Sequence, residues 1–179
     1  MGSCSSANKL PVSIMTIDRQ PTSSSPNLTM VDHLQTFADD DYSTIESIQI
    51  FSGKYIKGIQ VNYSVNLLSK KCDIMGTGAH TTKQTMKFSE CEYIDALTLY
   101  HDNVAITGIH ISTTKGNQMF FGNEDNKPFR REVNLKDTEK VVVGFRGVVG
   151  EFLSDLEVYQ AQIDKQDIQD TISSLALDD

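Results

Sequence analysis

From Ile45 onward, apolar residues follow a pattern that is neither helical nor a simple alternation: apolar, two other residues, apolar, one other residue, apolar. The complete copies are Ile45/Ile48/Ile50, Ile56/Ile59/Val61, Ile94/Leu97/Leu99, Ile106/Ile109/Ile111 and Leu153/Leu156/Val158. A sixth copy begins with Val142 and Phe145 and has Gly147 in its third place. Because β-branched residues dominate and one extra residue interrupts the alternation, we expect strands that each carry a β-bulge.

The six copies form three pairs, and a short turn joins the two members of each pair. The turns are Ser52-Gly53-Lys54, His101-Asp102-Asn103 and the glycine-containing stretch from Val148 to Glu151. Equivalent positions in successive pairs are about 48 residues apart. A period that is held over three units indicates an internal repeat, so each unit predicts a β-hairpin.

Shorter strand-like runs lie outside the hairpins, at Val12/Ile14, Cys72/Ile74, Met86/Phe88, Met119 to Phe121 and Val133/Leu135. Three hairpins with such outer strands predict an all-β fold of three antiparallel sheets around a shared core. We divide the chain into residues 1–10 as an anchor, 11–36 as an extension and linker, 37–160 as the domain and 161–179 as an acidic tail. Prolines and serines predict a mobile spacer over residues 18–36.

Three runs carry a resemblance to a known family: FADDDYSTIESIQIFSGKYIKGIQVNY, FSECEYIDALTLY and VVVGFRGVVGEFLSDLEVY. They resemble the jacalin-related lectins, and the likeness extends from about Phe37 to Tyr159. The resemblance implies a β-prism I fold of three four-stranded Greek-key sheets with pseudo-threefold symmetry. The internal period leads to the same arrangement independently.

Mannose-binding members of that family hold the sugar with a glycine-rich N-terminal loop and with a closing-hairpin motif of glycine, three residues and aspartate. Glycine lets the backbone approach the ring, and the carboxylate accepts hydrogen bonds from sugar hydroxyls. The motif falls here on Gly150, Glu151, Phe152, Leu153 and Ser154, with serine in the place of the aspartate. Asp155 is adjacent, but strand side chains alternate between faces, so Asp155 points away from the pocket unless a bulge intervenes.

The other two turns do not supply the missing carboxylate, because Lys57 and Thr107 occupy the matching positions. The segment NLTMVDHLQT, which precedes the first long strand, contains no glycine. Since a charged hydrogen bond contributes about 1.5–3 kcal/mol, we expect mannose-type binding to be weak or absent. The alternative is a carbohydrate-binding lectin that uses the turn from Gly150 to Phe152.

The N-terminal sequence MGSCSSANK matches the N-myristoylation pattern, since removal of Met1 exposes Gly2 and Ser6 follows at the preferred distance. One myristoyl chain binds membranes only marginally. Cys4 can carry a second chain by S-palmitoylation. This interpretation predicts a peripheral protein on the cytosolic side of a membrane; the alternative is a disordered serine-rich start, or a cloning remnant, in a cytoplasmic protein.

The composition excludes several classes of function. The chain has 179 residues and a net charge of −8, with 24 acidic and 16 basic residues. This balance disfavours nucleic acid and non-specific attraction to anionic lipid. The three cysteines lack the paired spacing of metal ligands or redox dithiols, which favours a reducing compartment.

No motif for catalysis or for a cofactor is present. The glycines of GFRGVVG and GTGAH do not open a helix, as phosphate-binding loops require. His33, His80, His101 and His110 lack the spacing of metal ligands, and no nucleophile sits beside a recognisable base. We therefore expect neither metal nor cofactor and a non-enzymatic scaffold or accessory subunit that binds a partner protein.

The C-terminal tail has two interpretations. Ile168, Ile172 and Leu175 have helical spacing and are flanked by aspartates. They predict either a short amphipathic helix that docks on a partner or on the domain, or an unstructured acidic tail.

Overall fold

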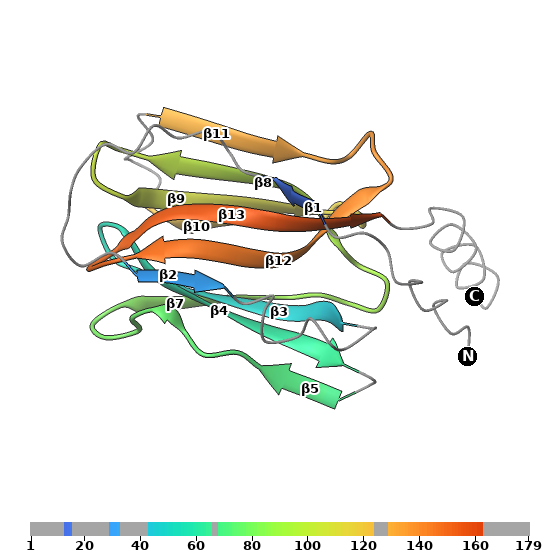
Figure 1. Cartoon of the computed structure of the whole chain (residues 1–179), viewed down its shortest axis with the longest axis horizontal. Helices are drawn as coiled ribbons and strands as arrows, with labels where there is room; N and C mark the ends of the chain where they lie inside the picture. Colours follow the sequence, from blue (N-terminus) through green and yellow to red (C-terminus); the bar gives the residue numbers. More distant parts are fainter. Residues whose placement is uncertain (1–12, 16–28, 33–42, 66–67, 124–128, 163–179) are drawn as a thin grey trace.

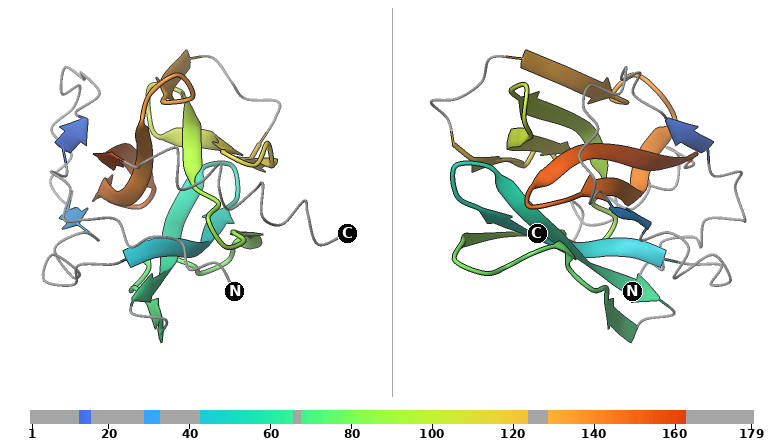
Figure 2. Two further views of the ribbon diagram at one scale, coloured as in Figure 1. Left: turned by 90° about the vertical axis from the view of Figure 1, so that its right-hand side faces the viewer. Right: turned by 60° about the vertical axis from the view of Figure 1, so that its left-hand side comes forward.

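The computed structural model describes residues 13–15, 29–32, 43–65, 68–123 and 129–162, which form thirteen β-strands (Figure 1). Every regular element in these ranges is a strand, and none of the described residues belongs to a helix that could span a membrane. Three groups of strands surround one interior, as the two views of Figure 2 show. The all-β prediction is confirmed.

The first sheet contains β3 (Ser43–Ser52), β4 (Ile56–Val65), β5 (Leu68–Lys71), β6 (Met75–Gly76) and β7 (Thr82–Lys87). Its strand order is β5-β4-β3-β7, and β6 also pairs with β4. The second sheet contains β8 (Ile94–His101), β9 (Ile106–Thr113), β10 (Gln118–Gly122) and β11 (Phe129–Asn134) in the order β10-β9-β8-β11. In both sheets the last strand returns to lie beside the first, which is the Greek-key arrangement.

The third sheet contains β1 (Ser13–Met15), β2 (Thr29–Asp32), β12 (Lys140–Val149) and β13 (Leu153–Gln162) in the order β1-β13-β12-β2. The pair Val142 and Ile94 joins β12 of this sheet to β8 of the second sheet. The molecule is thus the three-sheet β-prism that the resemblance implied.

Two of these strands lie in residues 11–36, which the sequence analysis assigned to an extension and linker. β1 was expected at Val12/Ile14, but β2 falls inside the predicted spacer. Among the described residues, the outer strands of the third sheet come from the N-terminal side of the chain, since β1 pairs with β13 and β2 pairs with β12. The prism therefore begins before Phe37, and the spacer interpretation is wrong for Thr29–Asp32.

The bulges occur where the sequence pattern placed them. In the first strand of each hairpin the register skips Glu46, Asp95 or Val143. In the second strand it skips Lys57, Thr107 or Ser154. Each skipped residue lies in the two-residue gap of one copy of the pattern, because a bulge lets apolar residues on both sides of the gap point to the same face.

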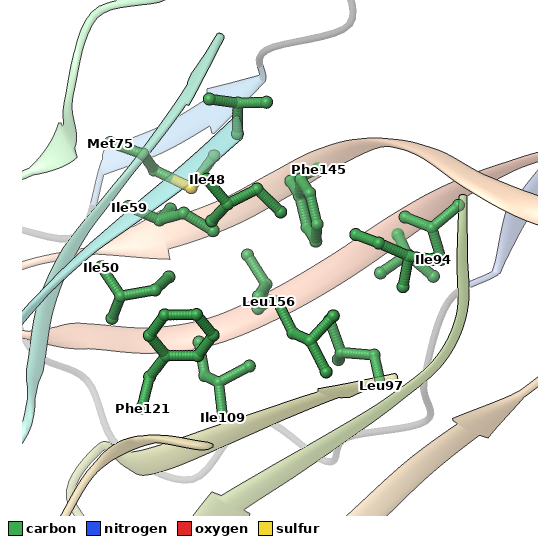
Figure 3. Close-up of a cluster of buried hydrophobic side chains, with 14 of the residues drawn as sticks. Ile48, Ile50, Ile59, Met75, Ile94, Leu97, Ile109, Phe121, Phe145 and Leu156 are labelled. Atoms are coloured by element: carbon green, nitrogen blue, oxygen red, sulfur yellow. The ribbon is translucent and has the colours of Figure 1, made fainter. Parts of the chain in front are cut away.

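The inward-facing side chains of the three sheets form a single core (Figure 3). Ile48, Ile50 and Ile59 come from the first sheet, Leu97, Ile109 and Phe121 from the second, and Phe145 and Leu156 from the third. All eight are at most 1% exposed. Burying one such side chain contributes about 1.5–3 kcal/mol, so these contacts hold the three hairpins and their turns in fixed relative positions.

An equivalent contact between an outer strand and a bulge occurs within each of the first two sheets. The carbonyl oxygen of Lys57 accepts a hydrogen bond from the Thr77 amide at 2.9 Å, and that of Thr107 accepts one from the Asn123 amide at 3.2 Å. The residues before these donors are Gly76 and Gly122, with φ angles of 103° and 104°. The pseudo-symmetry thus extends to the conformation of single outer-strand residues.

Candidate functional site at the tip of the third hairpin

The turn between β12 and β13 contains the candidate residues Gly150, Glu151 and Phe152. The Gly150 amide donates a hydrogen bond to the carbonyl oxygen of Phe152 at 3.1 Å. The first hairpin closes in the same way, from the Gly53 amide to the Tyr55 carbonyl at 2.9 Å. The Gly150 N–H is therefore used to close the turn, and it is not directed at a ligand.

The first and third hairpin tips lie at the same end of the molecule and touch (Figure 1). The ring of Phe152 lies 4.7 Å from that of Tyr55, between centroids. The Lys57 ammonium lies 5.9 Å from the centre of the Phe152 ring, and that of Lys54 lies 5.1 Å from the centre of the Tyr55 ring. The tip therefore presents the partly exposed ring of Phe152, which packs on the buried Tyr55 and is bordered by positive charge.

The three positions that correspond to the family's aspartate are structurally equivalent, because Lys57, Thr107 and Ser154 are all bulge residues. None of the three has a carboxylate. The candidate Ser154 is partly exposed at the third tip, whereas Thr107 is fully buried. Sequence reasoning identified these substitutions, but it gave no sign that Lys57 and Tyr55 lie against Phe152.

Asp155 lies next to the bulge and does not replace the missing carboxylate. Its Oδ1 forms an ion pair with the Arg131 guanidinium of β11 and accepts a hydrogen bond from the Leu156 amide at 2.9 Å. The side chains of Arg131 and Asp155 are only 15% and 17% exposed. Asp155 therefore ties the third sheet to the second and is directed away from the tip.

The equivalent positions in the other two repeats show why the third sheet can hold a side chain at the position of Asp155. Gly58 and Gly108 occupy it in the first and second sheets. A Cβ atom on Gly58 would lie 2.9 Å from the Thr77 carbonyl oxygen, and one on Gly108 would lie 2.5 Å from the Phe120 ring. The third sheet leaves room for Asp155, which lines a hollow with Arg146, Gly147, Val148 and Glu157.

Several predicted features lie outside the described residues. These are the lipidation residues Gly2 and Cys4, His33, most of the glycine-free segment before the first long strand, and the tail from residue 163. His80, His101 and His110 are described, and no group of three or more metal-binding side chains occurs among the described residues.

The model of the jacalin-like lectin domain matches residues 32–159. Wild-type Malaysian banana lectin is similar in structure, with a TM-score of 0.62 and 18% identity over 75% of this chain and 91% of that chain. Frutapin, a lectin from Artocarpus incisa, gives a TM-score of 0.62 and 17% identity over 87% and 99% of the two chains. Artocarpin, in complex with Me-alpha-mannose, gives 0.59 and 14% over 66% and 83%.

No significant match occurs among curated protein sequences. The structural likenesses have low identity and show the fold. The family match covers most of the chain, from the last residue of β2 through the turns of all three hairpins, including the candidate tip. The chain belongs to the jacalin-like lectin domain family.

Proposed function

We propose that this protein is a non-enzymatic binding module of the jacalin type that lacks mannose-type recognition and acts as a scaffold or accessory subunit for a partner protein. The observation that supports the loss of sugar binding is the bulge position of the third hairpin. Ser154 occupies it, and the nearest carboxylate, Asp155, is held by Arg131.

Asp155 cannot turn toward the tip without a large cost. Arg131 and Asp155 are both mostly buried, so moving Asp155 toward the tip would break an ion pair in a poorly solvated place. Breaking a buried pair in this way costs about 3–5 kcal/mol. A serine hydroxyl at position 154 is neutral and forms weaker hydrogen bonds to sugar hydroxyls than a carboxylate does.

Calorimetric titration with mannose and galactose tests this proposal. We expect no saturable binding by the natural protein. Ser154→Asp is expected to gain mannose affinity by about tenfold or more, because one charged hydrogen bond contributes about 1.5–3 kcal/mol. Ser154→Asn is the matched control, since it has the same shape without the charge and should gain little. Saturable mannose binding by the natural protein would contradict the proposal.

A specific observation favours a second candidate, which is a carbohydrate-binding lectin that uses the turn from Gly150 to Phe152. The Phe152 ring is partly exposed and packs on Tyr55, so the tip offers an aromatic surface on which the apolar face of a sugar ring can stack. If a glycan array detects binding, Phe152→Ala or Glu151→Gln should abolish it. Binding that both variants retain would place the sugar elsewhere.

We further propose that acyl chains on Gly2 and Cys4 hold the module on the cytosolic face of a membrane. The N-terminal sequence supports this, because it places a myristoylation glycine two residues before a cysteine. Two chains provide the stable attachment that one myristoyl chain does not.

Mass spectrometry of the native N-terminus tests the anchor. We expect Gly2 to carry myristate and Cys4 a thioester-linked chain that hydroxylamine removes. An unmodified Gly2 would overturn the proposal. Comparing masses with and without reductant is also informative. A Cys4 sulfur held in a disulfide would exclude the palmitoyl chain.

A further inference from the structure

The charges of this chain are distributed unevenly over the three sheets. In the whole chain 24 acidic residues outnumber 16 basic ones. Residues 43–88, which form the first sheet, reverse this balance: their lysines are Lys54, Lys57, Lys70, Lys71, Lys83 and Lys87, and their carboxylates are Glu46 and Asp73. The net charge of the chain therefore conceals a positively charged sheet.

Three of these lysines share the outer face of the first sheet. Lys87 pairs with Ser47, Lys71 pairs with Asn62, and Lys83 pairs with Phe51. Residues that pair across strands point to the same face, and the alternating residues Ile48, Ile50 and Val61 are buried in the core. Lys71, Lys83 and Lys87 are therefore directed outward, and all three are exposed. We call this surface the lysine face.

The strands between these lysines present polar side chains to the same side. Asn62 donates a hydrogen bond to the Ser47 hydroxyl at 2.8 Å, and Gln60 donates one to the Cys72 carbonyl at 2.9 Å. At one end Glu46 accepts a hydrogen bond from Ser69. Within the described part of the chain, none of the three lysines forms an ion pair. The three lysines are thus the exposed, positively charged groups of this face, whereas Ser47, Gln60 and Phe51 between them are buried.

The spacing of the lysines indicates what kind of anion they fit. Lys83 and Lys87 are separated by four positions on β7, which is about 13 Å along an extended strand. Lys71 lies on β5, across two intervening strands from β7, which is about 14 Å. These charges do not converge on one small anion. They spread in two dimensions, which matches a planar array of anionic groups better than a small ligand or a single linear polyanion.

We propose that the lysine face docks on an anionic membrane surface. The inference rests on the proposed function, because an acyl anchor would bring the domain to a membrane and a basic surface would add to its attachment. Each lysine near an anionic surface strengthens binding by about fivefold. The net charge alone predicts that anionic lipid does not attract this chain. Electrostatic attraction, however, acts within a Debye length of about 8 Å, so the charge of the face nearest the membrane matters more than the net charge of the whole chain.

Sedimentation with lipid vesicles tests the proposal, using the full chain produced without acyl chains. We expect binding to phosphatidylcholine vesicles that contain phosphatidylserine, a decrease at high salt, and no binding to phosphatidylcholine alone. Lys71→Glu/Lys83→Glu/Lys87→Glu should weaken binding by about 100-fold or more, since three lysines are lost and three carboxylates are gained.

The matched control is Lys115→Glu/Lys136→Glu/Lys140→Glu, which changes the net charge equally at exposed lysines outside the first sheet. It should retain most of the binding, and unfolding midpoints confirm that both variants fold. Equal loss in the two variants, or no binding by the natural chain, would overturn the proposal. Binding to heparin but not to vesicles would also overturn it and would favour an acidic polysaccharide.

The vesicle experiment tests the lysine face independently of the acyl anchor, because the protein used has no acyl chains. Failure of vesicle binding leaves the mass-spectrometric test of Gly2 and Cys4 unaffected. An unmodified Gly2 would likewise leave the vesicle result standing.

Discussion

Replacing Gly76 with alanine is expected to lower the free energy of unfolding by about 2–5 kcal/mol. Gly76 has a φ angle of 103°, which is unfavourable for a residue with a side chain. A Cβ atom there would lie 2.2 Å from the carbonyl oxygen of Lys57. Because that oxygen belongs to a bulge and already accepts the Thr77 amide, it has little freedom to move. Urea denaturation measures the effect.

Two other glycines distinguish the two causes of the lower free energy of unfolding, which are the backbone strain of a positive φ angle and the close contact with the bulge. Gly116 has a φ angle of 81° and open space around it, so Gly116→Ala should show backbone strain alone, about 1–2 kcal/mol. Gly53 lies in a turn with open space and no positive φ, so Gly53→Ala should change stability by less than about 0.5 kcal/mol. If Gly76→Ala costs no more than Gly116→Ala, the close contact with the bulge is absent.

Gly122 tests the pseudo-symmetry of the prism in the same experiment. It has a φ angle of 104°, and its Cβ would lie 2.4 Å from the Thr107 carbonyl oxygen. Gly122→Ala should therefore cost about as much as Gly76→Ala.

Replacing Glu92 with glutamine is expected to destabilise the protein by about 2–4 kcal/mol at neutral pH. Glu92 is only 4% exposed. Its carboxylate accepts hydrogen bonds from the amide and hydroxyl of Ser89, from the Thr113 hydroxyl and from the Asn117 amide group, at 2.7–2.9 Å. These bonds fasten the segment before β8 to the turn between β9 and β10. A glutamine keeps one acceptor oxygen and places an NH₂ group against hydrogen-bond donors.

The same residue predicts how stability depends on pH. Burial alone would raise the pKa of Glu92, but the hydrogen bonds outweigh burial and lower it from 4.5 to about 2. The folded state therefore binds this proton less readily than the unfolded state. The stabilisation is fully present above pH 4.5 and is lost as the pH falls toward 2. It amounts to about 3 kcal/mol.

Urea denaturation between neutral pH and pH 3 compares the natural protein with Glu92→Gln. The variant should lose most of the acid-dependent decrease in stability. Glu90→Gln removes an exposed carboxylate from the same segment and should behave like the natural protein. An unchanged pH profile in Glu92→Gln would show that other carboxylates cause the acid sensitivity.

The sequence predicted the hairpins and their bulges because both depend on local burial. Each copy of the pattern contains enough neighbouring apolar residues to reveal its inward face, and the extra residue in the gap marks the bulge, as at Glu46 and Lys57. The outer strands are less visible. β2 has only four residues, and it forms a strand because β12 offers an unpaired edge. Such pairing leaves little trace in the composition of the segment.

Some features of the candidate site can likewise be predicted from the sequence, and others depend on the tertiary structure. The absence of a carboxylate at Lys57, Thr107 and Ser154 could be read from the residues, because the repeat places these positions in register. The contact of Phe152 with Tyr55, and the ion pair that holds Asp155 on Arg131, join segments that are distant along the chain. Their proximity follows from the packing of one sheet on another.

The sequence by itself determined three bulged hairpins and a tip without its acidic residue, since local side-chain character decides which strand face is buried. Only the tertiary structure decided which N-terminal segments complete the third sheet, where Asp155 finds its counter-ion and which lysines share one face. The physical reason is that strand pairing and charge clustering depend on distances in space, and those distances exist only once the three sheets have closed around their common core.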